Sequence, residues 1–220
     1  MNVLCDLSAR LHAVDPYAAF EGEGLQLDLQ GWNSERPVFR ELIEALRPGL
    51  ILEIGAWKGA SAIHMARILH ELGLGGSRIL SIDTWLGSLD CWEPRSGLYK
   101  SLRLKNGYPR LYEQFLFNVI QCGLTQTIIP FPQTSLGAAG WLKKNNVTAP
   151  LIYVDAGHTV EEVLSDLKNY YEILTGGGII FGDDFGDPLG GVCEAVRDFA
   201  RMKQLLFETR EDQFWLFRKK

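Results

Sequence analysis

The chain has 220 residues, of which 46% are hydrophobic and 22% are charged, and its formal net charge is −5. This composition is typical of one α/β domain with a buried core, and the negative charge disfavours nucleic acid and anionic lipid as partners. The four cysteines form no C-x-x-C pair, so the sequence indicates neither a zinc knuckle nor a thioredoxin-type site. Without a recognisable signal peptide or an apolar run of about 20 residues, we expect a cytoplasmic protein with reduced thiols.

The first part of the chain predicts an extension followed by a strand–helix domain. Residues 1–35 have weak periodicity and many turn formers, so we interpret them as an N-terminal extension or lid ahead of a domain at 36–220. Pro37 begins a predicted helix that reaches Leu46. Short apolar runs then predict buried strands, with a helix after the first, at residues 50–54, 78–83, 127–131, 151–155 and 179–182.

The later elements complete an α/β pattern. Thr159 and Glu162 form a capping box for a helix that we expect to end at Gly176–Gly178. A further helix and a closing hairpin are predicted at residues 192–199, 205–209 and 213–218. Repeated strand–helix units favour a Rossmann-like, doubly wound, mostly parallel sheet, and the hairpin supplies an antiparallel C-terminal strand. In such sheets ligands bind beyond the carboxyl ends of the strands.

The segment 85–117 follows neither the helical nor the strand period. Connections of this length in compact domains are usually functional lids. Aromatic residues lie among its prolines and glycines, as suits an adaptable wall over a bound molecule. We therefore interpret 85–117 as a lid over a small-molecule acceptor.

A glycine-bearing turn, Glu53-Ile54-Gly55-Ala56-Trp57-Lys58-Gly59, links the first strand to a helix. Gly55 permits a tight turn, and Gly59 lets a ligand approach free helix amides. The turn lacks the G-x-G-x-x-G dinucleotide fingerprint, and Glu53 is a poor neighbour for a pyrophosphate. An acidic residue here suits a cation such as the amino-acid end of S-adenosylmethionine (SAM); the alternative is an ordinary strand–helix turn.

Asp83 ends the second predicted strand and is followed by Trp85. An acidic residue at that place can accept both ribose hydroxyls of a nucleoside, although a turn or cap aspartate is the alternative. Trp85 could stack on a base or pack in the core. The two positions therefore extend the candidate ligand site from the glycine turn to the neighbouring strand.

Three carboxylates end the fourth and fifth predicted strands, namely Asp155, Asp183 and Asp184. Neighbouring strands lie about 4.8 Å apart, so these groups should converge, and without a cation their mutual repulsion raises their pKa values. An all-oxygen site suits Mg²⁺ or another hard divalent cation. His158 stands beside it and could take a proton at neutral pH. The alternative is a set of solvated turn residues with a surface histidine.

Together these motifs resemble the class I SAM-dependent methyltransferases over residues 32–218. The likeness is greatest to small bacterial metal-dependent O-methyltransferases of the macrocin and mycinamicin type, which act on sugars. The motifs that carry it are Leu52-Glu53-Ile54-Gly55, Asp83-Thr84-Trp85-Leu86-Gly87, Val154-Asp155-Ala156-Gly157-His158 and Gly182-Asp183-Asp184-Phe185. The catechol-type enzymes usually carry Lys at the position of His158, so the chain is closer to the sugar-type branch.

The resemblance implies a role for each candidate residue. The residues that it places around SAM are Glu53, Gly55, Gly59 and Ser61 at the methionine part, Asp83 at the ribose, with Trp85 beside it, and Thr134 and Ser135 near the adenine. It makes Asp155, Asp183 and Asp184 the metal ligands and His158 the general base. The reaction that follows is methyl transfer to a hydroxyl of a sugar or natural product.

Two rival functions stay open at the level of sequence. A nucleotide-dependent oxidoreductase or hydroxylase could use the same sheet, although the missing third glycine disfavours it. A non-catalytic SAM-binding module is the other rival. In each case we expect a small-molecule ligand and neither nucleic acid nor a membrane as partner, while a homo-oligomer is compatible with the sequence.

Overall fold

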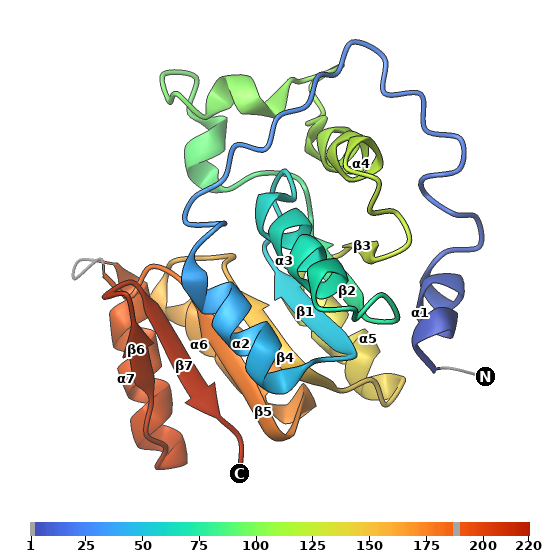
Figure 1. The fold of residues 1–220 in the computed structure, drawn as a ribbon. Helices are drawn as coiled ribbons and strands as arrows, with labels where there is room; N and C mark the ends of the chain where they lie inside the picture. The colour runs from blue at the N-terminus through green and yellow to red at the C-terminus, as the bar shows by residue number, and fades with distance from the viewer. Residues whose placement is uncertain (1–2, 187–189) are drawn as a thin grey trace.

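A seven-stranded sheet forms the centre of the molecule (Figure 1). The computed structural model describes residues 3–186 and 190–220. The strand order is β3-β2-β1-β4-β5-β7-β6, and β1 to β5 are parallel while β7 runs antiparallel to β5 and β6. The strands are β1 (Leu50–Ile54), β2 (Arg78–Asp83), β3 (Ile128–Pro132), β4 (Ala149–Val154), β5 (Leu174–Gly182), β6 (Glu208–Arg210) and β7 (Phe214–Arg218). The predicted mostly parallel α/β fold with an antiparallel C-terminal strand is confirmed.

Helices cover both faces of this sheet (Figure 1). They are α1 (Val3–Leu11), α2 (Pro37–Leu46), α3 (Ala60–Glu71), α4 (Leu111–Gln121), α5 (Ser135–Lys144), α6 (Val160–Ile173) and α7 (Gly191–Lys203), with 3₁₀ turns η1 (Leu89–Trp92) and η2 (Tyr99–Leu102). Helices α2, α3 and α4 contribute to one hydrophobic cluster, and α5, α6 and α7 to the other. Within the described residues, none of these helices has the length and apolarity needed to cross a membrane.

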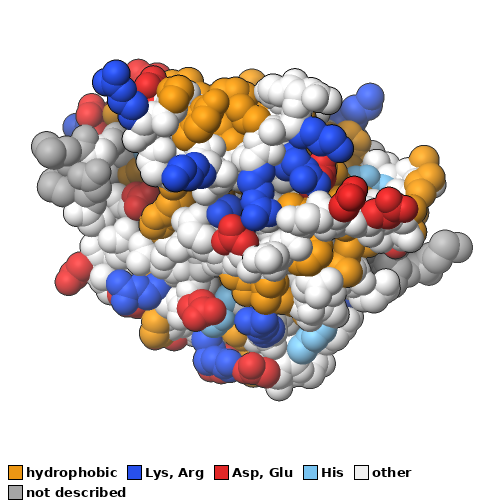
Figure 2. Space-filling view, turned by 90° about the horizontal axis from the view of Figure 1, so that it is seen from above, with side chains coloured by type: hydrophobic (Ala, Val, Ile, Leu, Met, Phe, Trp, Pro, Cys, Tyr) orange, Lys and Arg blue, Asp and Glu red, His pale blue; other side chains and the backbone are white. Residues whose placement is uncertain are grey.

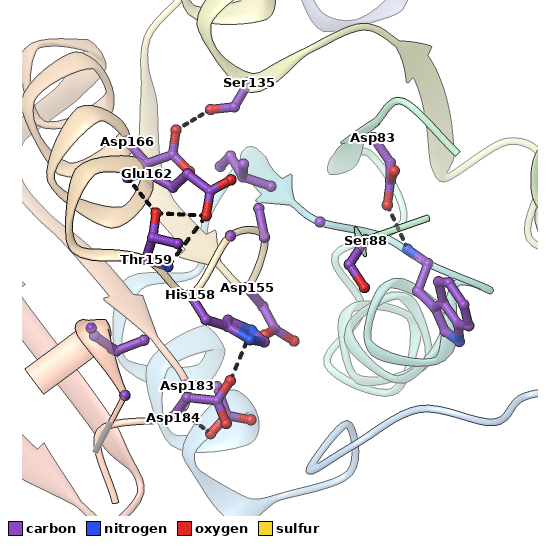
Figure 3. A pocket seen from close by; sticks show the side chains of 18 of the residues that line it. Asp83, Ser88, Ser135, Asp155, His158, Thr159, Glu162, Asp166, Asp183 and Asp184 are labelled. Carbon is purple, nitrogen blue, oxygen red and sulfur yellow. Dashed lines mark hydrogen bonds and ion pairs between the residues drawn. The ribbon is translucent and has the colours of Figure 1, made fainter. Parts of the chain in front are cut away.

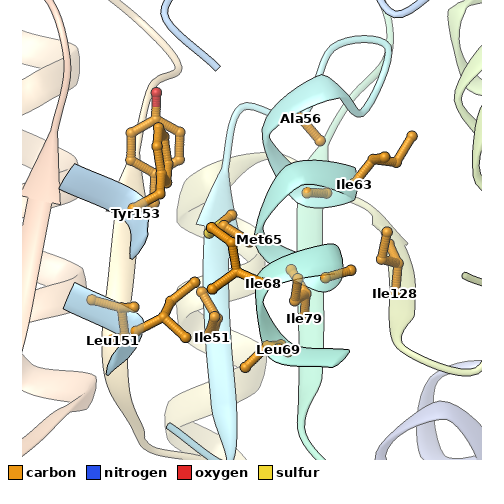
Figure 4. Close-up of a cluster of buried hydrophobic side chains, with 14 of the residues drawn as sticks. Ile51, Ala56, Ile63, Met65, Ile68, Leu69, Ile79, Ile128, Leu151 and Tyr153 are labelled. Atoms are coloured by element: carbon orange, nitrogen blue, oxygen red, sulfur yellow. The ribbon is translucent and has the colours of Figure 1, made fainter. Parts of the chain in front are cut away.

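The core alternates along each strand, because successive side chains of a strand point to opposite faces. Ile51 packs with Leu151 and with Ile68 of α3 in the first cluster, whereas Leu52 packs in the second (Figure 4). All of these side chains are almost fully buried. Burying a side chain of this size stabilises a fold by roughly 1.5–3 kcal/mol, so the two clusters fix the sheet rigidly.

The register aligns the ends of the parallel strands. Ile54 pairs with Ile82 on one side and with Val154 on the other, and Val154 pairs with Gly182. The residues that follow these pairs therefore meet at one edge of the sheet. This is the edge at which the sequence placed its candidate ligands.

Several boundaries differ from the predicted ones. Helix α6 ends at Ile173, and Gly176–Gly178 lie inside β5, where the pairing jumps from Leu174 to Ile179 and the glycines form an irregular bulge. Helices α1 and α5 were not predicted from the sequence, and α4 begins inside the predicted lid. Helix α5 has two glycines and little amphipathicity, so its sequence carries a weak helical signal.

Candidate functional site

A large cavity opens at the carboxyl ends of the strands (Figure 3). Its volume is about 1750 Å³, above the ~300–1,000 Å³ typical of a site for one small ligand, so it has room for a donor and an acceptor together. The predicted site residues that line it are Gly55, Ser61, Asp83, Thr134, Ser135, Asp155, His158, Asp183 and Asp184. Residues 31–34 and 87–91 add two further walls.

Gly55 is required by the close approach of two strand ends. Its φ is +88°, and a Cβ at this position would lie 1.9 Å from the backbone oxygen of Asp155. Gly59 has φ +87°, and a Cβ there would lie 3.0 Å from the ring of Phe115 on α4. Gly59 is therefore needed for packing against α4. The sequence predicted a contact of Gly59 with the cofactor, but Gly59 does not line the cavity.

Glu53 faces the interior of the protein and does not line the cavity. It is fully buried, and its two carboxylate oxygens accept hydrogen bonds from Ser61 Oγ at 2.5 Å and Ser81 Oγ at 2.6 Å. Burial raises the pKa of Glu53 to about 7 despite these bonds. The Glu53 carboxylate thus binds Ser61 at the start of α3 and Ser81 of β2, and its contact with SAM stays a prediction.

Asp83 does line the cavity, but its carboxylate already organises the glycine turn. Oδ2 accepts the backbone N–H groups of Ala56 (2.9 Å) and Trp57 (2.8 Å), and Oδ1 accepts that of Trp85 (2.7 Å). Burial is the main cause of the raised pKa of Asp83, and these bonds oppose it. A carboxylate offers about four acceptor positions, and the backbone N–H of Thr84 is a fourth group that acts on this one, so a ligand hydroxyl would share an acceptor position with the turn.

The Trp85 side chain lies in the core, which corrects its prediction as a cofactor contact. Its exposed fraction is 2%, and its indole N–H donates to the Trp57 carbonyl at 2.8 Å. The ring packs 4.8 Å from the rings of Tyr112 and Phe115. The core position was the alternative that the sequence left open.

Thr134 and Ser135 begin α5 at the end of the cavity near β3. Thr134 caps the helix by accepting the N–H of Gly137 at 3.1 Å, and the Ser135 hydroxyl donates to Asp166 of α6. Burial raises the pKa of Asp166 to about 6. Sequence reasoning missed Asp166, although an acidic residue between Val163 and Leu167 on the buried face of an amphipathic helix is an unusual placement that could have revealed it.

At the opposite end, Asp155, His158 and Asp184 converge (Figure 3). Their potential ligand atoms all lie within 4.8 Å of one another, and His158 Nε2 is 3.0 Å from Asp184 Oδ2. The Tyr153 hydroxyl donates to Asp155 at 3.0 Å. Burial, followed by the charges of Asp183 and Asp184, raises the pKa of Asp155 to about 7. The hydrogen bond to Asp184 raises the pKa of His158.

Asp183 lies behind this cluster. It is 4% exposed, and its Oδ1 accepts the backbone N–H of Asp184 and the side-chain amide of Gln213, both at 2.7 Å. Burial raises the pKa of Asp183, and the nearby side chain of Asn33 is one of the groups that oppose this shift. Asp183 lines the cavity but is not among the three residues whose ligand atoms all lie within 4.8 Å of one another, so its role as a metal ligand stays a prediction. Gln213 is a supporting residue that no sequence motif indicated.

Comparison with known proteins agrees with this geometry. Residues 52–185 match the methyltransferase domain family. A curated relative, the 8-demethyl-8-(2,3-dimethoxy-alpha-L-rhamnosyl)-tetracenomycin-C 4'-O-methyltransferase of Streptomyces olivaceus, is 27% identical over 160 residues, which are 69% of this chain. The chain spans 58% of the length of that relative.

Similar solved structures share the fold. The O-methyltransferase NovP superposes with a TM-score of 0.62 at 18% identity, over 99% of this chain and 97% of that chain. An O-methyltransferase from Bacillus cereus in complex with SAH gives 0.60 at 14% identity, over 100% and 92%. TomG from Streptomyces achromogenes, in complex with SAM, gives 0.58 at 16% identity, over 97% and 99%. Because the family match alone covers more than half of the chain, the chain belongs to the methyltransferase domain family and has the fold of the class I SAM-dependent methyltransferases.

Proposed function

We propose that the protein transfers the methyl group of SAM to a hydroxyl of a small molecule, with a sugar-bearing natural product as the favoured acceptor. The observation that carries this proposal is one cavity that joins the glycine turn to the Asp155–His158–Asp184 cluster. The turn offers a donor site, and the cluster offers groups that can activate a hydroxyl. The name of the curated relative, a rhamnosyl 4'-O-methyltransferase, supports a sugar acceptor.

The donor is proposed to lie along the predicted cofactor residues that line the cavity. Gly55 and Ser61 would contact its methionine part, and the Asp83 carboxylate would contact the ribose. Thr134 and Ser135 would border the adenine at the α5 end. An acceptor hydroxyl could approach such a donor from the side of the cavity that Asp155 lines.

A divalent cation, Mg²⁺ in the first instance, fits the acidic end of the cavity. Asp155 and Asp184 supply carboxylate oxygens, and these are the ligands that hard cations prefer. When bound, such a cation lowers the pKa of an acceptor hydroxyl that it contacts. Asp183 would hold the chain that carries Asp184 through the bond to the Asp184 N–H. The raised pKa of Asp155 means that its ionised form is poorly stabilised in the protein alone, and a bound cation would supply the missing positive charge.

His158 is the proposed general base. Its Nε2 faces Asp184, so in the neutral ring Nε2 carries the proton and Nδ1 is the atom that can accept one from the acceptor. Asp184 then stabilises the imidazolium that forms. General-base catalysis of this kind contributes about 10²–10⁴-fold in rate.

The first experiment compares ligand binding by the purified protein. S-adenosylhomocysteine at a hundredfold excess over its dissociation constant should stabilise the fold by ~2.7 kcal/mol, and NADH should not. A thermal shift with NADH alone would instead support the oxidoreductase alternative. Binding of S-adenosylhomocysteine without any methyl transfer to glycosylated or phenolic acceptors would support a binding module.

The second experiment separates the base from the metal ligand. His158→Gln should lower kcat by ~10²–10⁴ and leave donor binding intact. His70→Gln is the matched control, because His70 bonds to Thr127 and does not line the cavity. Asp184→Asn should abolish the response of activity to added Mg²⁺. Full activity of the chelator-treated enzyme would exclude the metal from the proposal and leave the base in place.

A further inference from the structure

The segment from residue 26 to residue 34, here called the strap, crosses the molecule between the helices and has no regular secondary structure (Figure 1). Its last four residues, Gly31–Ser34, line the cavity. The face seen from above carries hydrophobic side chains among charges of both signs (Figure 2). An exposed charge pair contributes only ~0–1 kcal/mol to the stability of a fold, so we expect buried contacts to hold the strap in place.

Asn118 of α4 is the centre of these buried contacts. Its side chain is fully buried, and its Nδ2 donates to the carbonyls of Asp28 at 2.7 Å and Lys58 at 2.8 Å. Its Oδ1 accepts the Asp28 N–H at 3.1 Å and the Gln114 amide at 2.9 Å. A carboxamide has two donors and two acceptor lone pairs, so Asn118 uses its full capacity. It thereby joins the strap to the glycine turn.

Neighbouring polar groups reinforce the same junction. Lys58, 3% exposed, pairs with the Asp28 carboxylate at 2.8 Å, and Gln114 donates to the Gln26 carbonyl at 2.8 Å. The Trp57 indole N–H donates to Gln30 Oε1 at 3.0 Å. Each contact fixes the strap before the point at which it enters the cavity wall.

Beyond this junction the strap reaches both ends of the site. Trp32 lies 5.9 Å from Trp57 between ring centroids, and Asn33 lines the same cavity as Asp183. Gly31 packs so closely on Ala60 at the start of α3 that a Cβ would lie 2.9 Å from the Ala60 Cβ. A shift of the strap would therefore move the wall of the cavity that Gly31–Ser34 form.

We propose that Asn118 is a positioning residue for the donor site: by holding the strap on the glycine turn, it places Gly31–Ser34 as a wall of the cavity. The expected effect on donor binding rests on the proposed function, whereas the expected effect on the position of the strap does not. Asn118 touches no part of the cavity itself, so it acts through the strap.

Asn118→Asp tests the inference directly, because it turns an amide donor that faces two carbonyls into a buried carboxylate acceptor. Asn169→Asp is the matched control: Asn169 is also a helical asparagine, it bonds to the Ser165 carbonyl and to Lys143, and it lies outside the cavity. If the Asn118→Asp protein does not fold, Asn118→Ala removes the same four hydrogen bonds without a charge.

The expected result has two parts. The dissociation constant of S-adenosylhomocysteine, measured by calorimetry, should rise about tenfold or more, and the donor KM should follow while kcat at saturating donor changes by less than about threefold. Hydrogen exchange at residues 29–34 should quicken about tenfold or more in the Asn118 variant only. Unchanged exchange at 29–34, or unchanged affinity in a protein that binds S-adenosylhomocysteine, would overturn the inference.

A double-mutant cycle gives the sharpest criterion. Asn33→Ala alone should weaken donor binding, but it should add little in the Asn118 variant, because the strap is already displaced there. Fully additive effects would mean that Asn118 does not act through the strap. A wild-type protein that fails to bind S-adenosylhomocysteine would contradict the proposed function, and the exchange measurement would then decide the role of Asn118 by itself.

Discussion

Replacing Glu53 by glutamine tests the energetic cost of a buried carboxyl group beside the glycine turn. Burial raises the pKa of Glu53 from its ordinary value of 4.5 to about 7 in the folded protein. The folded state therefore holds this proton more tightly than the unfolded state, and stability falls as the pH rises from about 4.5 to about 7. Each pKa unit corresponds to about 1.36 kcal/mol, so ionisation of Glu53 costs the fold about 3 kcal/mol above pH 7.

Urea unfolding of wild type and Glu53→Gln at pH 5 and pH 8 measures this cost. Glutamine cannot ionise, so the difference in free energy of unfolding should move by ~2.5 kcal/mol in favour of the variant between these two pH values, because a small part of the cost is already present at pH 5. The contribution of a buried acid that does not act on Glu53, such as Asp166, cancels in the difference. Glu41→Gln, at an exposed position of α2, is the control and should show no such change. A difference that is independent of pH would refute the reasoning.

The same variant also decides between a direct and an indirect role at the cofactor site. The Glu53 carboxylate faces Ser61 and Ser81, and their hydroxyls can rotate to accept from a glutamine amide. Glu53→Gln should therefore keep its affinity for S-adenosylhomocysteine within a few-fold. A loss of ~100-fold or more with the fold intact would restore the direct contact predicted from the sequence.

Three further predictions concern the backbone and the acidic cluster. Gly55→Ala should prevent folding or destabilise the protein severely, because its Cβ would lie 1.9 Å from the Asp155 carbonyl oxygen. Gly73→Ala is the control: Gly73 has φ +70° and no atom within 4 Å of an added Cβ, so the change should cost only ~1–2 kcal/mol in chemical denaturation. Thr159→Ala should lower stability by ~0.5–2 kcal/mol in the same assay, because it removes the capping box of α6. Affinity for Mg²⁺, measured by calorimetry, should fall as the pH drops from 8 to 6, because a proton then occupies Asp155, whose pKa is about 7. Binding that does not change over this range would contradict the proposed ligand role of Asp155.

The sheet could be predicted because its strands are short apolar runs that end in glycine or aspartate. Strand β2 has the predicted bounds, and the capping box correctly marks the start of α6. The end of α6 could not be predicted from Gly176–Gly178, because the pairing of β5 with β4 draws these glycines into an irregular strand. Tertiary pairing of this kind overrides the local helix-stop signal.

The cofactor residues were predicted by position, and position does not decide which way a side chain points. Gly55, Ser61 and Asp83 line the cavity, whereas Glu53 and Trp85 point into the protein. Both inward-facing groups find polar partners there, in the serine hydroxyls and the Trp57 carbonyl. The strap contacts were beyond sequence reasoning altogether, since Asp28 and Asn118 are 90 residues apart in the chain.

The two consecutive aspartates, Asp183 and Asp184, differ in geometry in a way that the sequence alone does not reveal. Adjacent residues of an extended strand point to opposite sides, so Asp183 and Asp184 can share a target only if the backbone turns between them. Asp184 does turn, with φ +63°, and its carboxylate reaches His158. Asp183 keeps the direction of β5, where Gln213 binds its carboxylate. Both aspartates line the cavity, but Asp184 reaches His158 while Asp183 accepts the Asp184 N–H and the Gln213 amide. His158 lies beside them because the α6 capping box holds the residue just before Thr159 at the mouth of the site.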